Sequence, residues 1–150
     1  MKCSIVATEL VAAWSETPDA IGWNGALSIL VECKANKEDF LADRNKRARL
    51  GRDEWSMGNR RFYLVPNSLK EFALENLKER WGLLVAHKTR VNTIVKSEHF
   101  KDTRKTDELL MLISIIRRIA GERKPITGVN VRCYTIGSDY PLATLGIEHD

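Results

Sequence analysis

The dipeptide Asn24-Gly25, between the apolar stretches AIGW and ALSILVECK, is the feature that most constrains how this chain can fold. Both residues accept the positive φ of a type I′ turn, so Asn-Gly in such a setting is a strong signal for a β-hairpin. The run Ile29-Leu30-Val31 is apolar on both faces, which is typical of a strand covered on both sides. The sequence therefore predicts a hairpin whose second strand lies in the interior of a sheet.

The register of this hairpin places three ionisable side chains on one face. With that dipeptide as a two-residue loop, the numbers of each cross-strand pair sum to 49, so Asp19 lies opposite Leu30. Because side chains alternate with period two, Leu30 shares a face with Glu32 and Lys34. Asp19 is then a diagonal neighbour of Glu32, at a backbone separation of roughly 7–8 Å.

Charges in the middle of an apolar strand are costly unless they are paired or bind a metal. Two carboxylates at this separation can converge on one Mg²⁺, which takes one or two carboxylates and keeps several waters. Such an ion lowers the pKa of a bound water, and we expect Lys34 to hold that water beside a phosphate. Alternatively, Asp19 caps a turn after Pro18, and Glu32 with Lys34 forms a structural ion pair, although positions i and i+2 of one strand are poorly placed for direct contact.

The rest of the chain alternates between helical and strand-like patterns. Predicted helices cover residues 4–15, 36 to about 50, 69–80 and 107–123, and predicted strands cover 61–66, 81–88 and 130–135 in addition to the hairpin. Asn36 is the expected N-cap of the second helix, with Asp39 as a partial capping box. Residues 89–106 are polar and receive no assignment. This order predicts an α/β fold, a mixed sheet flanked by helices on both faces.

Length and composition are those of one globular domain of 150 residues. No apolar run reaches about 18 residues and no signal peptide is apparent, so we expect no membrane span and a cytoplasmic location. Cys3, Cys33 and Cys133 are far apart and odd in number, which argues against disulfides and a CxxC zinc site. Cys33 and Cys133 are expected to be small buried thiols within strands.

The formal net charge is +4, and basic residues cluster at 44–52 and 96–105. A basic balance fits a polyanionic partner such as nucleic acid, although a solvated basic face explains the charge equally well. On the predicted second helix, Asp39, Asp43, Lys46 and Arg47 share one face, either as a phosphate clamp or as a cap followed by a surface ion pair. Trp55, in a polar loop, is the tryptophan best placed to stack on a base.

Pro18-Asp19 followed by Glu32-Cys33-Lys34 resembles the motif of the PD-(D/E)XK nuclease superfamily. The stretches ECKANKEDFLADRNKR, RRFYLVPNSL and ERWGLLVAH are similar to MmcB-like and related phage nuclease-like proteins, over about residues 9–90. The resemblance implies a restriction-endonuclease-like core over about 4–90, with the last helix and strand as an extension. It also implies a catalytic set of Asp19, Glu32, Lys34 and Glu9, with Asp19, Glu32 and Cys33 at a Mg²⁺ or Mn²⁺ ion.

The function expected from this resemblance is metal-dependent hydrolysis of DNA in repair, recombination or phage DNA processing. The predicted DNA-binding residues are Asp43, Lys46, Arg47, Arg49, Arg60 and Arg61. DNA is the expected partner, without a membrane or nucleotide cofactor, and a homodimer or a repair-protein partner stays open. Two alternatives remain: a DNA-binding or partner-binding module on the same fold, and a structural phage-type protein in which the triad is a relic.

Overall fold

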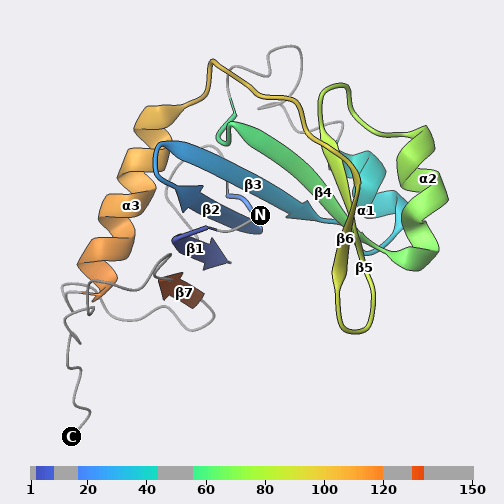
Figure 1. The fold of residues 1–150 in the computed structure, drawn as a ribbon, viewed down its shortest axis with the longest axis horizontal. Coiled ribbons are helices and arrows are strands. Elements are labelled where there is room, and N and C mark those ends of the chain that lie inside the picture. The colour runs from blue at the N-terminus through green and yellow to red at the C-terminus, as the bar shows by residue number, and fades with distance from the viewer. Residues whose placement is uncertain (1–2, 9–16, 44–55, 120–129, 134–150) are drawn as a thin grey trace, which may run out of the picture.

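The computed structural model describes residues 3–8, 17–43, 56–119 and 130–133. Its framework is an open seven-stranded sheet in the order β6-β5-β4-β3-β2-β1-β7 (Figure 1). The strands are β1 (Ile5–Thr8), β2 (Ala20–Asn24), β3 (Leu27–Cys33), β4 (Arg60–Pro66), β5 (Gly82–Ala86), β6 (Val91–Val95) and β7 (Asn130–Cys133). The helices are α1 (Lys37–Ala42), α2 (Lys70–Glu75), which follows a 3-10 turn η4 (Asn67–Leu69), and α3 (Lys105–Ile119). The predicted α/β class with a mixed sheet is confirmed.

The predicted β2–β3 hairpin forms, with its turn one residue later than expected. Asn24 pairs with Leu27, so the two loop residues are Gly25 and Ala26, and the pair numbers sum to 51. Only Gly25 of these two has a positive φ, at 58°, which is the pattern of a type II′ turn. The shift of two in the sum preserves the face of every side chain. β3 is central, between antiparallel β2 and parallel β4.

The segments β3-α1-β4 and β4-α2-β5 are successive crossovers between parallel neighbours. Since such crossovers are right-handed and both advance in the same direction across the sheet, they place α1 and α2 on the same face. The third helix, α3, lies at the opposite end of that face (Figure 1). Its residues Met111 and Ile115 join Phe40 of α1 and Ala73 of α2 in one buried cluster, so all three described helices cover the same side. The described helices therefore differ from the prediction that helices flank both faces.

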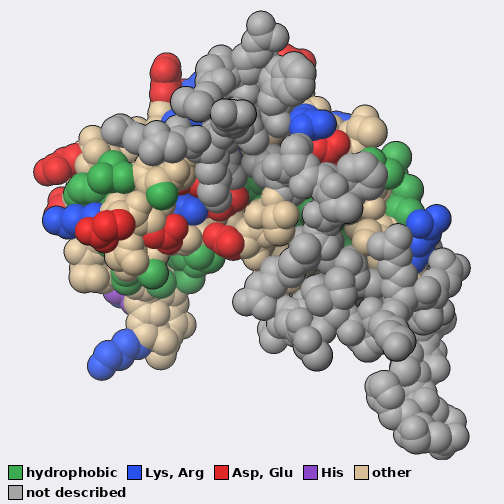
Figure 2. All heavy atoms as spheres, turned by 180° about the vertical axis from the view of Figure 1, so that it is seen from behind, with side chains coloured by type: hydrophobic (Ala, Val, Ile, Leu, Met, Phe, Trp, Pro, Cys, Tyr) green, Lys and Arg blue, Asp and Glu red, His purple; other side chains and the backbone are tan. Residues whose placement is uncertain are grey.

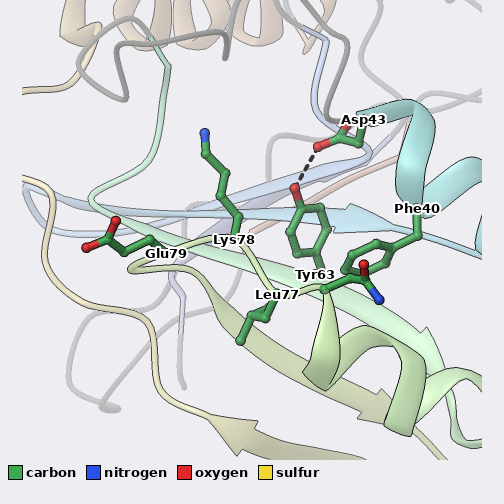
Figure 3. Close-up of a pocket in the computed structure, with 7 residues that line it drawn as sticks. Phe40, Asp43, Tyr63, Leu77, Lys78 and Glu79 are labelled. Carbon is green, nitrogen blue, oxygen red and sulfur yellow. Dashed lines mark hydrogen bonds between the residues drawn. The ribbon is translucent and has the colours of Figure 1, made fainter.

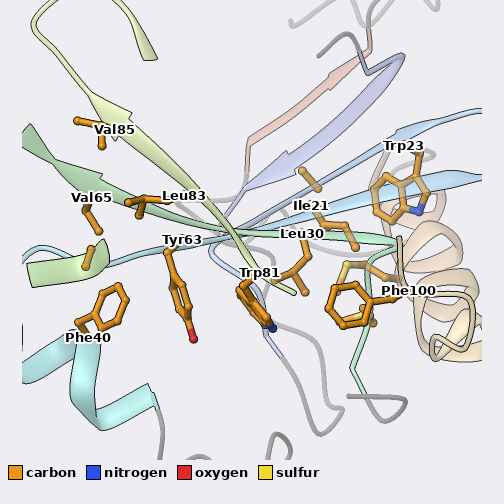
Figure 4. Packing of buried hydrophobic residues seen from close by; sticks show 14 of the residues in the cluster. Ile21, Trp23, Leu30, Phe40, Tyr63, Val65, Trp81, Leu83, Val85 and Phe100 are labelled. Carbon is orange, nitrogen blue, oxygen red and sulfur yellow. The ribbon is translucent and has the colours of Figure 1, made fainter. Parts of the chain in front are cut away.

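This cluster is rich in aromatic rings that pack on one face of the sheet (Figure 4). The ring of Tyr63 lies 4.7 Å from that of Phe40 and stacks at 4.6 Å on that of Trp81. On the other face, Phe62 is buried over Gly82, where a Cβ atom would overlap its ring. Aromatic packing therefore fixes β4 and β5 from both sides.

Several elements differ from the sequence predictions. Residues 5–8 form strand β1 and not part of a helix, while 9–16 fall outside the described residues. The unassigned segment 89–106 contains strand β6, paired with β5, and the start of α3. The helix α2 ends at Glu75, five residues before the predicted end. None of the described helices is long and apolar enough to cross a membrane.

A buried polar network joins α3 to the β2–β3 hairpin and to the loop before β4. Glu108, only 3% exposed, accepts hydrogen bonds from Ser28 Oγ at 2.8 Å, Gly58 N at 3.0 Å and Trp23 Nε1 at 3.4 Å. Lys105 Nζ lies 2.9 Å from the same carboxylate. Four donors from separate parts of the chain thus converge on a single side chain.

Replacing Glu108 by Ala should lower the free energy of unfolding by about 2 to 3 kcal/mol, because it leaves buried donors without their acceptor. Urea unfolding followed by circular dichroism measures this change. The matched control is Glu98→Ala, since Glu98 is exposed and its ion pair with Arg80 is a surface contact of little energetic weight. Equal effects of the two substitutions would contradict an anchoring role for Glu108.

Candidate functional site

The candidate site lies where β3 ends and α1 begins. The ladder to β4 continues one residue past β3, because Lys34 N donates to Leu64 O at 2.9 Å. The predicted cap is confirmed: Asn36 Oδ1 accepts from Asp39 N at 2.8 Å, and Asp39 Oδ2 accepts from Ala35 N at 3.3 Å. The chain therefore turns into α1 directly after Lys34, and the short helix carries its last residues back beside that lysine.

Lys34 is held between two carboxylates. Its Nζ lies 3.3 Å from Glu32 Oε2 and 3.4 Å from Asp43 Oδ1. All three residues are almost fully buried, with exposures of 1% for Glu32, 4% for Lys34 and 1% for Asp43. Glu32 and Lys34 thus share a face as predicted, and they also make the direct contact that their spacing made unexpected. We call Glu32, Lys34, Asp43 and Tyr63 the acid–lysine cluster.

Tyr63 completes the cluster from the neighbouring strand. Its hydroxyl donates to Asp43 Oδ2 at 2.7 Å (Figure 3). In the parallel register of β3 and β4, Tyr63 is the direct partner of Glu32, so the two side chains project from the same face. The sequence predicted strand 61–66 but gave no role to Tyr63, because its partner Asp43 lies 20 positions away in the chain. The available signal was the hydroxyl group of Tyr63, which is a polar group in the otherwise apolar stretch FYLVP of that strand.

The electrostatics of the cluster favour a charged lysine. Burial alone lowers the pKa of the Lys34 ammonium, but Glu32, Asp43 and Asp39 outweigh it, helped by the hydrogen bond to Glu32, and the pKa rises above its ordinary value of 10.5. Lys34 is therefore protonated throughout the physiological range. A buried cation fixed in this way can orient a water or neutralise a phosphate oxygen.

Asp19 lies beside this cluster at the edge of the hairpin. The observed register ends at Ala20 opposite Val31, so Asp19 extends it towards Glu32 and not towards Leu30. Asp19 is exposed, and its Oδ2 accepts from Cys33 N at 2.7 Å. This contact ties the carboxylate to the backbone of the residue that follows Glu32. This contact reaches a residue 14 positions away across the hairpin, so it is not the cap of a turn after Pro18 that was given above as the alternative.

Cys33 differs from its prediction as a buried thiol, because it is exposed at the end of β3. Partial enclosure by its neighbours, then the carboxylates of Asp19 and Glu32, raise the pKa of the thiol above its ordinary value. A protonated thiol is a poor metal ligand.

The chemistry of these donors fits Mg²⁺. Asp19 and Glu32 both carry hard carboxylate oxygens, one bound to the backbone of Cys33 and one in contact with Lys34, and Mg²⁺ uses one or two carboxylates with water filling its other positions. Within the described ranges, no group of three or more His, Cys, Asp or Glu side chains is arranged to hold a metal ion.

A pocket of about 280 Å³ opens beside the acid–lysine cluster (Figure 3). Asp43 and Tyr63 belong to both, so anything bound in the pocket lies next to the cluster. The remaining lining combines apolar and polar side chains: Phe40, Asn76, Leu77, Lys78 and Glu79. The pocket thus offers room for a ligand group on the α1 and α2 side of the cluster.

For two residues, Arg61 and Asp43, the prediction of a DNA contact is wrong, because both side chains are buried. Arg61 is fully buried, its guanidinium donates to backbone carbonyls of Ser56, Met57 and Gly58, and it stacks on Phe100 at 3.9 Å. It therefore holds the loop before β4 and cannot reach a phosphate. Asp43 is likewise buried, within the acid–lysine cluster.

The other predicted residues divide between described and undescribed parts of the chain. Arg60 is half-buried and donates through Nη1 to Ser97 O. Glu9, Lys46, Arg47, Arg49 and Trp55 lie outside the described residues. Acidic and basic side chains are intermixed on the described surface around α1 and α2 (Figure 2). The described part of that end is thus not a surface of one sign.

Comparison with known proteins supports the fold and assigns no function. No family model matches the sequence, and no curated protein matches it. The chain is similar to a solved structure of a protein of unknown function from Silicibacter pomeroyi, with a TM-score of 0.58 and 25% sequence identity. The similarity covers 83% of this chain and 86% of that chain, so it extends over most of both.

Proposed function

We propose that this protein is a metal-dependent DNA nuclease that hydrolyses phosphodiester bonds. The observation that carries the proposal is the contact of Lys34 with Glu32 at the end of the central strand β3, with Asp19 bound to the adjacent backbone. The Asp, Glu and Lys positions of the resemblance to a PD-(D/E)XK motif thus lie near one end of β3, which supports the proposal. DNA repair, recombination or phage DNA processing in the cytoplasm is the proposed setting.

The roles follow from the chemistry of each group. Asp19 and Glu32 would hold the ion, and Mg²⁺ in such a site supplies Lewis acidity and a water of lowered pKa. Lys34, kept charged by its carboxylate neighbours, stabilises negative charge on the phosphate and positions the attacking water. Glu9 is proposed to assist from the segment that precedes β2. Arg60 and the basic residues Lys46, Arg47 and Arg49 are proposed to bind the DNA backbone.

A second candidate is a binding module on the same fold, in which the cluster only stabilises the protein. The near-complete burial of Glu32, Lys34 and Asp43 favours this candidate. The positive charge of Lys34 partly compensates the two carboxylates inside the protein, so the cluster can be explained as a structural ion-pair network. On this reading the chain holds DNA or a repair partner, and cleavage is weak or absent.

Incubation with end-labelled single-stranded, duplex and branched DNA separates the two candidates. The nuclease proposal expects cleavage of at least one substrate with Mg²⁺ or Mn²⁺ and none with EDTA. Cleavage that persists in EDTA would argue against metal dependence. Binding of DNA without cleavage under any of these conditions would favour the binding module.

Charge reversal at Arg47 and Arg49 should weaken DNA binding across all sequences. Each phosphate contact that is lost should reduce the slope of log K against log salt by about one unit. Fluorescence anisotropy with labelled DNA at several salt concentrations measures the slope. The matched control is charge reversal at Lys88 and Arg90, two exposed basic residues of the β5–β6 loop. An unchanged slope in the Arg47 and Arg49 variant would identify these residues as ordinary solvated surface.

A further inference from the structure

The ring of Tyr63 is fixed by the aromatic core, while its hydroxyl belongs to the acid–lysine cluster. Its ring lies between those of Phe40 and Trp81, at centroid distances of 4.7 and 4.6 Å (Figure 4). The residue is only 3% exposed, and its backbone in β4 pairs in parallel with β3 on one side and with β5 on the other. The packing of the ring in the core therefore fixes the position of the Tyr63 hydroxyl group.

That hydroxyl controls the orientation of Asp43. Asp43 Oδ2 accepts from the Tyr63 hydroxyl at 2.7 Å, while Oδ1 lies 3.4 Å from Lys34 Nζ. Because the two oxygens face different partners, rotation of the carboxylate would break at least one contact.

Lys34 is a flexible side chain, and its ammonium has no fixed direction of its own. Here Glu32 contacts it from its own strand and Asp43 from α1, so two elements define its position. We infer that Tyr63 and Asp43 are positioning residues, which hold the Lys34 ammonium in place for the reaction through the chain Tyr63–Asp43–Lys34. The reaction in question is the proposed nuclease activity, on which this inference rests.

The first test is kinetic and uses Tyr63→Phe, which keeps the ring between Phe40 and Trp81 and removes only the hydroxyl. Misplacement of a reacting group by about 1 Å can cost about 100-fold in rate, so we expect kcat to fall by about 10- to 100-fold. KM for DNA and the Mg²⁺ concentration for half-maximal activity should change less than about twofold, because neither ligand contacts the hydroxyl in the proposed arrangement. Asp43→Asn should behave in the same way.

Glu38→Gln is the matched control, since it removes a carboxylate from the first turn of the same helix and Glu38 is exposed. It should leave kcat and KM at their wild-type values. If Tyr63→Phe cleaves DNA at the wild-type rate, or if Glu38→Gln loses as much activity as Asp43→Asn, the positioning role is overturned.

The second test needs no activity. In a ¹⁵N-lysine-labelled protein, the Lys34 ammonium should give a signal protected from exchange with water, identified by its disappearance in Lys34→Met. We expect its exchange to accelerate by about tenfold in both Tyr63→Phe and Asp43→Asn, as contacts that restrict the ammonium are lost, and to be unchanged in Glu38→Gln. Equal exchange in wild type and both cluster variants would overturn the inference.

The two tests separate this inference from the proposed function. If the wild-type protein cleaves no DNA, the nuclease proposal fails, and ammonium exchange alone then decides whether Tyr63 and Asp43 position Lys34. If wild type cleaves but neither rate nor exchange responds to Tyr63→Phe, the nuclease proposal stands and the positioning role is wrong.

Discussion

Glu32→Gln should slow DNA cleavage by about a thousandfold or more, since loss of several kcal/mol of metal-derived stabilisation costs about tenfold per 1.4 kcal/mol. The amide keeps the size of the side chain and an oxygen that can face Lys34, so the fold should survive. DNA affinity should be retained or increase, because one negative charge near the phosphates is removed. Cleavage of labelled DNA with Mg²⁺ and anisotropy with Ca²⁺ in its place measure the two properties separately.

Glu71→Gln serves as the control, because Glu71 is exposed on α2 and lies outside the acid–lysine cluster. It should cleave at the wild-type rate. If Glu32→Gln also cleaves at that rate, the activity comes from elsewhere in the chain or from a contaminant. Inactivity of wild type and variant alike, on every substrate and with Mn²⁺ present, would decide for the binding module.

Lys34→Met should abolish cleavage and lower the free energy of unfolding by about 3 to 5 kcal/mol, because it leaves two buried carboxylates without their shared cation. Metal binding by Asp19 and Glu32 should persist. The loss of stability should shrink as the pH is lowered, since protonation of a carboxylate removes the uncompensated charge. Urea unfolding at a series of pH values measures the loss.

A compensated variant provides the control for this prediction. Glu32→Gln and Asp43→Asn together with Lys34→Met remove all three charges, and the triple variant should recover most of the stability that the single one loses. In wild type, the folded-state pKa of Lys34 lies above 10.5, so its stabilising effect is complete below that value and is lost only as the pH rises through the folded-state pKa. A loss below about 1 kcal/mol in Lys34→Met would mean that the cluster behaves as a surface pair.

The hairpin shows how much local pattern can predict. Asn24-Gly25 located the turn to within one residue, and alternation placed Glu32 and Lys34 on one face. The exact register depended on whether Asn24 joins the loop or pairs with Leu27, and cross-strand packing decides that question. The observed pair numbers sum to 51 and not to 49. Because this difference is an even number, each side chain still lies on the face of the sheet that was predicted for it.

The edges of the sheet were less predictable. Ile5–Thr8 carry apolar residues that fit a helix as well as a strand, and the choice depends on pairing with β2 and with β7, which is distant in sequence. Val91–Val95 is interrupted by polar residues because it lies at the sheet edge, where much of the strand is exposed. Both strands are defined by their partners more than by their own composition.

The candidate site was predicted where a single strand supplied it and missed where the tertiary fold did. Glu32 and Lys34 stand two positions apart, whereas Asp43 and Tyr63 reach them from a helix and from the next strand. Arg61 illustrates the opposite error, because a basic residue beside another in sequence gave no sign that its guanidinium would be enclosed by a loop and by Phe100. Charge in a sequence indicates a partner only when burial is known.

The pairing of β1 with β7 has a consequence for the order in which the chain folds during synthesis. Residues 5–8 join residues 130–133 in this ladder, while β2 to β6 pair among residues 20–95. A ribosome releases the chain from its N-terminus at about 5–20 residues per second, so the inner strands are available seconds before β7 emerges. During that interval, the outer side of β1 is an open edge with unpaired backbone groups, which is the kind of surface on which partly made chains associate.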